Sequence, residues 1–302
     1  MSVLSHPVAT ALAARVARLG ARAGMRPPLD RFPEFPRRTD EISVPTSLGP
    51  ARAVLYRPAG TSSPPLHVNL HGGGFVLGLT ELDDPLCRAV AELADVAVLN
   101  VDYALAPRHP FPGPARQAHE VLRWAASHGE RHGWDGTRLS VGGQSAGGSL
   151  AAAAARQVLE RGGPALALQA LLYPVLDLST PLRAKRSPQG RPMSWPRLGE
   201  LLSDSYVPDP RQRTDRLISP AAPGATADLT GIAPALLITA GADVLHDEGE
   251  RYAGALREVG ALAEHHDVAD AGHGFDVRDP VLARETYELI ARHVRRALHP
   301  QG

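Results

Sequence analysis

The sequence predicts an α/β fold in which a mostly parallel central sheet is flanked by helices. Three observations support this prediction: the chain has 302 residues, 43% of them are hydrophobic, and strand-like segments alternate with helix-like ones. A chain of this length and apolar content can bury the core of one large domain. Alternation of strands with helices is typical of parallel sheets, because each crossover places a helix against one face.

The expected strands are short apolar runs, as is typical when both faces of a strand are buried. They occupy residues 51–56, 66–70, 96–101, 138–141, 170–174, 235–240 and 262–268. The expected helices have apolar residues at helical spacing. They occupy residues 84–93, 115–130, 146–160, 248–259 and 282–298.

Two segments fall outside this alternation and are expected to form one helical cap. Residues 1–40 begin with an amphipathic helical pattern and continue into several prolines, and residues 179–223 are rich in Pro, Arg and Ser. Insertions into an α/β sheet lie at the carboxyl ends of strands, where ligands bind. Residues 41–178 and 224–302 would then form the catalytic core. The alternative is that both segments only decorate the surface.

Composition argues against several classes of function. Lys plus Arg and Asp plus Glu each number 32, so no net charge attracts nucleic acid or an anionic membrane surface. No stretch approaches the roughly 20 apolar residues of a membrane span, and the start of the chain lacks the apolar region of a signal peptide. The one cysteine, Cys87, excludes an internal disulfide. We therefore expect a cytoplasmic protein with neither a nucleic-acid nor a membrane partner.

The candidate nucleophile is Ser145, in the segment Gly143-Gln144-Ser145-Ala146-Gly147. An expected strand leads into this segment and an alanine-rich helical pattern follows it. A serine on such a sharp turn projects its hydroxyl out of the backbone, and the flanking glycines avoid the clash of a Cβ. The alternative is a glycine-rich helix start that only allows tight packing on the strand.

A glycine run, His71-Gly72-Gly73-Gly74-Phe75, follows an expected strand at the same edge of the sheet. Consecutive glycines let the backbone approach a ligand closely and aim several N–H groups at one point, as an oxyanion hole requires. The alternatives are a flexible loop and a phosphate cradle. A phosphate loop would require a lysine after the glycines, and none follows here.

The candidate base is His273, one of 13 histidines. It lies between two glycines in a loop after an expected strand, which leaves its ring free to point into a site. His265 and His266 lie within that strand, where alternate burial is the simpler account. His246 lies in an acidic loop that we expect to be exposed.

The candidate acid is Asp243, which closely follows an expected strand and should lie at the edge of the site. Asp247 and Glu248 begin the next helix and are better explained as residues that cap it and interact with its dipole. Asp270 is the remaining rival. The chain order of serine, aspartate and histidine is that of α/β-hydrolases, and the three segments together predict acyl transfer through a serine nucleophile.

The chain also resembles bacterial members of the hormone-sensitive lipase family of α/β-hydrolases. The glycine run resembles the oxyanion motif of that family, residues 103–112 resemble its Y-x-L-A-P-E-x-x-F-P segment, and residues 243–249 resemble D-x-L-x-D-E-G. The resemblance extends from about residue 51 to residue 298 and covers the cap segments only loosely.

The resemblance implies a carboxylesterase with an α/β-hydrolase fold that cleaves small-molecule esters of short-to-medium acyl chains without a cofactor or metal. It identifies the backbone N–H groups of Gly73, Gly74 and Ala146 as the oxyanion hole. It also places the last strand and helix at a sheet edge that relatives use for pairing, which leaves a homodimer open. From their position in the cap, four residues are expected to form the acyl or alcohol pocket: Trp195, Leu198, Leu202 and Tyr206.

Two positions depart from the family pattern. Gln144 stands where the family usually has an acid, and Arg108 stands where Glu is common. Gln144 keeps its hydrogen-bonding capacity but removes a charge beside the nucleophile, so we expect altered rate or substrate preference with an intact triad. Two other functions stay open: hydrolysis of an amide or formamide on the same residues, and a non-catalytic ligand-binding protein of the same fold.

Overall fold

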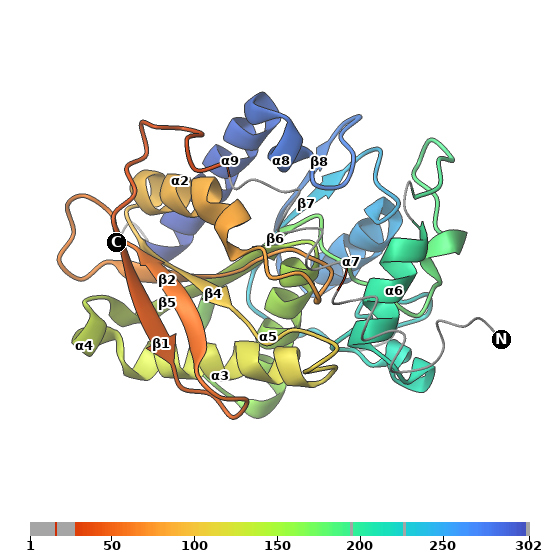
Figure 1. Cartoon of the computed structure of the whole chain (residues 1–302), viewed down its shortest axis with the longest axis horizontal. Helices are drawn as coiled ribbons and strands as arrows, with labels where there is room; N and C mark the ends of the chain where they lie inside the picture. Colours follow the sequence, from red (N-terminus) through yellow and green to blue (C-terminus); the bar gives the residue numbers. More distant parts are fainter. Residues whose placement is uncertain (1–15, 17–27, 194–195, 226–227, 300–302) are drawn as a thin grey trace.

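The computed structural model describes residue 16 and residues 28–193, 196–225 and 228–299 (Figure 1). The expected pocket residue Trp195 lies outside this part of the chain. So does nearly all of the amphipathic pattern expected at the start of the cap.

One sheet contains all eight strands of the described residues, in the order β1-β2-β4-β3-β5-β6-β7-β8. Among them, β2 alone runs against the others. The mostly parallel sheet predicted from the sequence is therefore confirmed. The strands are β1 (Thr39–Val44), β2 (Ala51–Tyr56), β3 (Pro65–Leu70), β4 (Ala97–Asp102), β5 (Asp135–Gln144), β6 (Leu166–Leu172), β7 (Ala235–Ala240) and β8 (Leu262–Val268).

Helices cover both faces of the sheet (Figure 1). One face packs against α3, α5 and α7, and the other against α2 and α9, so the core is divided into two apolar layers. The described helices are α2 (Asp84–Ala94), α3 (Gly113–Ser127), α4 (Gly129–His132), α5 (Ala146–Arg161), α6 (Pro196–Tyr206), α7 (His246–Glu258), α8 (Phe275–Arg278) and α9 (Pro280–Leu298). None of these helices is both long enough and apolar enough to cross a membrane.

The strand β1 was missed by the sequence prediction, and the reason is its position. It pairs only with β2 at the edge of the sheet, and its residues are mostly exposed or half-buried. Its sequence therefore has no continuous apolar run, unlike the central strands. The helix predicted over residues 115–130 is instead two helices, α3 and α4, which meet at His128.

The parallel strands bring distant segments to one edge of the sheet. The glycine run follows β3, Ser145 follows β5, Asp243 follows β7, and His273 follows β8. Because these strands are parallel, all four segments lie at the carboxyl edge, which is the usual ligand-binding edge of such sheets.

The segment 179–223 adds no strand to the sheet. It contains the short helices η3 (Leu182–Ala184) and η4 (Pro210–Thr214) as well as α6. Residues of η3 and α6 line the same cavity as Ser145. This arrangement supports the proposal that the segment is a cap over the site.

Candidate active site

The turn between β5 and α5 holds Ser145 in a strained conformation, with φ of 53° and ψ of −117°. Its N–H donates to the carbonyl oxygen of Leu172, at 2.9 Å, which fixes the turn to the end of β6. Gly147 allows the turn to pack against β3, because a Cβ at this position would lie only 1.8 Å from the carbonyl oxygen of Leu70. Close packing of the turn on β3 thus requires a glycine at position 147.

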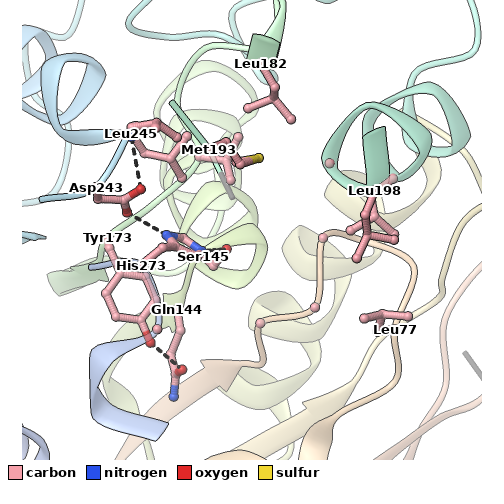
Figure 2. Close-up of a pocket in the computed structure, with 18 of the residues that line it drawn as sticks. Leu77, Gln144, Ser145, Tyr173, Leu182, Met193, Leu198, Asp243, Leu245 and His273 are labelled. Carbon is pink, nitrogen blue, oxygen red and sulfur yellow. Dashed lines mark hydrogen bonds and ion pairs between the residues drawn. The ribbon is translucent and has the colours of Figure 1, made fainter. Parts of the chain in front are cut away.

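Ser145, His273 and Asp243 form a hydrogen-bonded row (Figure 2). The distance from Ser145 Oγ to His273 Nε2 is 2.8 Å, and that from His273 Nδ1 to Asp243 Oδ2 is 2.6 Å. A proton on Nδ1 donates to the carboxylate, and Nε2 is then free to accept the serine proton. The other oxygen of Asp243 accepts the N–H of Leu245, at 3.1 Å.

The surroundings of His273 favour its protonated form. Burial lowers the pKa of His273, but the charge and hydrogen bond of Asp243, with smaller contributions from Asp276 and Glu248, raise it above the ordinary value. The Asp243 side chain is only 2% exposed, whereas the His273 side chain is 38% exposed. The ring can therefore meet a substrate while its carboxylate partner stays away from water.

The glycine run forms a tight loop beside Ser145. Gly73 and Gly74 have φ of 118° and 59°, a region that favours glycine. The loop is fixed by Tyr103, whose hydroxyl donates to the carbonyl oxygen of His71 at 2.9 Å. Among the described residues, the N–H groups of Gly73, Gly74 and Ala146 have no hydrogen-bond acceptor. They are therefore available to a bound oxyanion.

A cavity of about 520 Å³ opens at Ser145. Apolar side chains form most of its wall. In Figure 2, Leu182, Met193 and Leu245 lie to one side of the serine, and Leu77 and Leu198 lie to the other. The serine hydroxyl thus stands between two apolar regions, as suits an ester whose acyl and alcohol parts extend in different directions.

Two of the residues expected to form the pocket, Leu198 and Leu202, line the cavity. Tyr206 does not: it is fully buried and stacks on Phe75, with 3.9 Å between ring centroids. The expectation for Tyr206 is therefore corrected, because its ring supports the cavity wall from behind. Leu182 and Met193 also line the cavity. Neither residue is predicted from the sequence, because no periodic pattern marks their segment.

The expectation for Glu248 is also corrected, because this residue does not cap its own helix. Its Oε1 accepts the N–H groups of Leu176, at 2.7 Å, and Asp177, at 3.3 Å, and its Oε2 forms an ion pair with Lys185. The two charged side chains are 1% and 6% exposed, respectively. This buried ion pair joins the 179–223 segment to α7, close to the loop of Asp243.

The rival site residues lie elsewhere. The Asp243 carboxylate is hydrogen-bonded to His273, whereas the described Asp270 has no such contact. His246 is partly shielded rather than exposed, with its Nε2 3.4 Å from Asp267 Oδ1. Arg108 is exposed and lies outside the described cavity lining. The geometry therefore brings together the serine, histidine and aspartate singled out by the sequence.

Comparisons with known proteins show the family of the chain. Residues 67–277 match a family described as having the alpha/beta hydrolase fold. The carboxylic ester hydrolase LipN of Mycobacterium tuberculosis is 36% identical over 270 residues, which cover 85% of this chain and 70% of LipN. The esterase LipI of the same organism is 34% identical, with 82% of this chain and 78% of LipI covered.

Solved structures give the same result. An esterase of Pyrobaculum calidifontis superposes with a TM-score of 0.82 at 33% identity, covering 93% of this chain and 92% of that one. The thermostable carboxylesterase EstE1, cloned from a metagenomic library, superposes with a TM-score of 0.80 at 30% identity, covering 99% and 100%.

Proposed function

This chain belongs to the hormone-sensitive lipase group of the α/β-hydrolase family, and on that premise we propose that it is a serine carboxylesterase for esters of short-to-medium acyl chains. The observation that carries the proposal is the row of Ser145, His273 and Asp243 at the base of an apolar cavity. Its relatives named as ester hydrolases support the reaction class.

The proposed reaction begins when Ser145 Oγ attacks the ester carbonyl carbon. His273 Nε2 accepts the serine proton, while Asp243 holds the ring tautomer and stabilises the imidazolium that forms. The carbonyl oxygen becomes an oxyanion and accepts hydrogen bonds from the N–H groups of Gly73, Gly74 and Ala146. In an enzyme, removal of one such donor typically costs about 3–4 kcal/mol of transition-state stabilisation.

Collapse of the tetrahedral intermediate breaks the bond to the alcohol oxygen, which takes the proton from His273. The acyl group then remains on Ser145 as an ester. A water molecule attacks this acyl-enzyme, with His273 again accepting a proton, and the carboxylic acid leaves as the serine regains its hydrogen. The reaction thus uses the same three side chains twice.

The cavity supports the substrate class in this proposal. Its volume of about 520 Å³ falls within the usual range for small-molecule sites, roughly 300–1,000 Å³. Its mainly apolar wall favours hydrocarbon chains. Names of relatives favour esters over amides, and the intact hydrogen-bonded row argues against a protein that only binds its ligand.

The experiment that tests this function is hydrolysis of p-nitrophenyl esters from acetate to palmitate by wild type and Ser145→Ala. We expect cleavage of the short and medium chains by wild type and none above background by the variant. Matched anilides in the same assay distinguish esters from amides. Wild type that is inactive on every ester, and that a fluorophosphonate probe leaves unlabelled, would contradict the proposal.

We further propose that the protein forms a homodimer through β8. This strand ends the sheet and has no neighbour on its outer side among the described strands. Its unpaired backbone groups can bond to the same strand of a second copy. Light scattering during size-exclusion chromatography tests this, and a mass of one chain at micromolar concentration would contradict it.

A cytoplasmic location is the final part of the proposal. The single cysteine, Cys87, is a buried free thiol, which suits a reducing compartment. Fractionation of the source cells with an antibody against the protein tests this location. Recovery in the secreted or membrane fraction would contradict it.

A further inference from the structure

A buried polar cluster lies next to Ser145 and His273. The hydroxyl of Tyr173 is 2.9 Å from Gln144 Oε1 and also bonds to Asp276 Oδ1. The hydroxyl of Tyr287 donates to Asp276 Oδ2, at 2.9 Å. All four side chains are buried, and that of Asp276 is fully inaccessible. The Asp276 carboxylate must therefore find its hydrogen-bond partners within the protein, and the two phenols supply them.

The number of protons in the cluster determines how it is arranged. A phenol has one proton, yet the Tyr173 hydroxyl faces two oxygens, one on Asp276 and one on Gln144. An ionised carboxylate can only accept, whereas an amide side chain has both an oxygen and an NH₂ group, whose positions are interchangeable by a half turn. With the amide turned, Gln144 donates to Tyr173, and Tyr173 and Tyr287 both donate to Asp276. Both phenolic protons then go to Asp276, and the Tyr173 hydroxyl oxygen accepts from Gln144.

This cluster touches the triad histidine through Tyr173. The ring of Tyr173 stands edge-on to the imidazole of His273, with 4.9 Å between centroids (Figure 2). Tyr173 is itself fixed by its N–H, which donates to the carbonyl oxygen of Ile238 at 2.7 Å. The cluster also reaches the nucleophile, because Gln144 directly precedes Ser145. Tyr173 thus contacts His273 through its ring and the residue before Ser145 through its hydroxyl.

We propose that Asp276 is a positioning residue that holds the His273 ring through Tyr173, and that position 144 is an amide because it must donate to the same hydroxyl. This inference rests on the proposed esterase function for its effect on rate. A carboxylate at position 144 could only accept, so it would place a second acceptor and a second negative charge against the single proton of Tyr173. The acid at position 276 and the amide at position 144 are therefore a matched pair.

Asp276 also acts on His273 by its charge. Burial lowers the pKa of His273, Asp243 chiefly raises it, and Asp276 adds to the increase. Arg31 donates to the backbone carbonyl of Asp276 at 2.5 Å. Among the described residues, Tyr173, Tyr287, Asp83 and Glu248 also act on Asp276 or His273. Arg278 donates to the carbonyl oxygen of His273, at 2.6 Å.

Asp276→Asn should lower kcat about tenfold and leave KM nearly unchanged, because Asp276 is not among the cavity-lining residues. Loss of the negative charge should also lower the pKa of His273. The base is active when neutral, so the acid limb of the pH–rate profile should move to lower pH. A purely structural role for Asp276 would not predict this direction.

Gln144→Glu should lower both kcat and the melting temperature. The double variant Gln144→Glu/Asp276→Asn exchanges the acid and the amide and should recover most of both losses. Asp279→Asn is the matched control: it changes an acid three residues further on, whose oxygen caps α9 through the N–H groups of Val281 and Leu282. Asn caps a helix as well as Asp does, so this variant should behave like wild type.

The test is a double-mutant cycle on wild type, the two single variants and the double variant, with Asp279→Asn beside them. Melting temperatures are measured first, because they test the acid–amide pair without any assay of activity. The pKa of His273 is then followed by NMR of its imidazole, which also needs no turnover. Finally, kcat and KM are measured from pH 5 to 9 on a p-nitrophenyl ester.

Recovery in the double variant, together with a lower His273 pKa in Asp276→Asn than in Asp279→Asn, is the expected result. If Asp276→Asn does not fold but the double variant does, this recovery of folding also supports the matched pair. Additive losses in melting temperature would overturn the matched pair, and an unchanged His273 pKa would overturn the link to the triad. Failure of the esterase proposal is distinguishable, since it would leave wild type inactive without altering either readout.

Discussion

The two sides of the cavity are held in different ways. The catalytic side, formed by Ser145, His273 and Asp243, is fixed by hydrogen bonds between polar groups. The cap side, formed by residues of the 179–223 segment, is an apolar wall attached to the core by the ion pair of Lys185 and Glu248. We therefore expect the reaction to depend on a few fixed atoms, and substrate preference to depend on many contacts, each with a small effect.

The largest expected difference between the two sides comes from removal of the triad acid. Asp243→Asn should lower kcat about 10⁴-fold, because the amide favours the wrong histidine tautomer. Leu198→Ala on the cap side should change kcat/KM only a few-fold. Leu198 is partly exposed, and its replacement by alanine removes only apolar contact. Both are measured on one p-nitrophenyl ester, and losses of similar size would contradict the division into two sides.

The pH profile separates the two sides in a second way. The raised pKa of His273 means that its protonated form persists to higher pH than that of an ordinary histidine. In the proposed mechanism the neutral ring is the base, so kcat/KM should fall about tenfold per pH unit below a midpoint above about 6.5. Leu198→Ala should keep the same midpoint. A wild-type midpoint below about 6 would show that Asp243 and its neighbours do not act on the ring as described.

The placement of Ser145, His273 and Asp243 next to one another is also the part of the cavity that the sequence predicted well. A strained turn between a strand and a helix leaves a local pattern of glycines around Ser145, and parallel strands necessarily place Asp243 and His273 at the same edge. The cap side leaves no such pattern. Leu182 and Met193 line the cavity only because of how the 179–223 segment folds back on the core.

Two further differences from the prediction have the same physical origin. Glu248 resembled a capping residue because its role depends on Lys185, far away in the sequence, and on the backbone of Leu176. Gln144 could be recognised as a departure from the family, but its partner Tyr173, and the Asp276 to which Tyr173 is bonded, come from other elements. Burial and partners of a polar side chain are properties of the tertiary structure.

A variant at the buried ion pair tests how the cap side is held. Glu248→Gln leaves the ammonium of Lys185 buried without its countercharge, and breaking such a pair typically costs about 3–5 kcal/mol of stability. Denaturant unfolding measures this cost. The expected effect on activity is smaller, a loss of up to about tenfold on longer esters, because the wall near Leu182 becomes less ordered.

The matched control is an exposed ion pair in the same segment. Arg183 and Glu200 are 2.9 Å apart, with side chains 71% and 30% exposed. Glu200→Gln should cost less than about 1 kcal/mol, as is typical of surface pairs. Equal losses of stability in the two variants would indicate that burial of the Lys185–Glu248 pair does not matter.

The smallest expected effect is also the most selective one. A Cβ added at Gly199 on α6 would lie 2.7 Å from Leu182 Cδ1 and 3.0 Å from Met193 Sδ. Both are movable ends of side chains, so Gly199→Ala should push them into the cavity at little cost. Replacement of glycine by alanine within a helix is itself stabilising, by up to about 1 kcal/mol.

Gly199→Ala should therefore lower kcat/KM a few-fold for the longest esters that wild type accepts and leave acetate unchanged. The melting temperature should stay the same or rise, which separates narrowing of the cavity from damage to the fold. A ratio of long-chain to short-chain activity equal to that of wild type would show that this end of the cavity does not receive the acyl chain. The chain would then extend toward Leu77 and Leu198, on the other side of Ser145 (Figure 2).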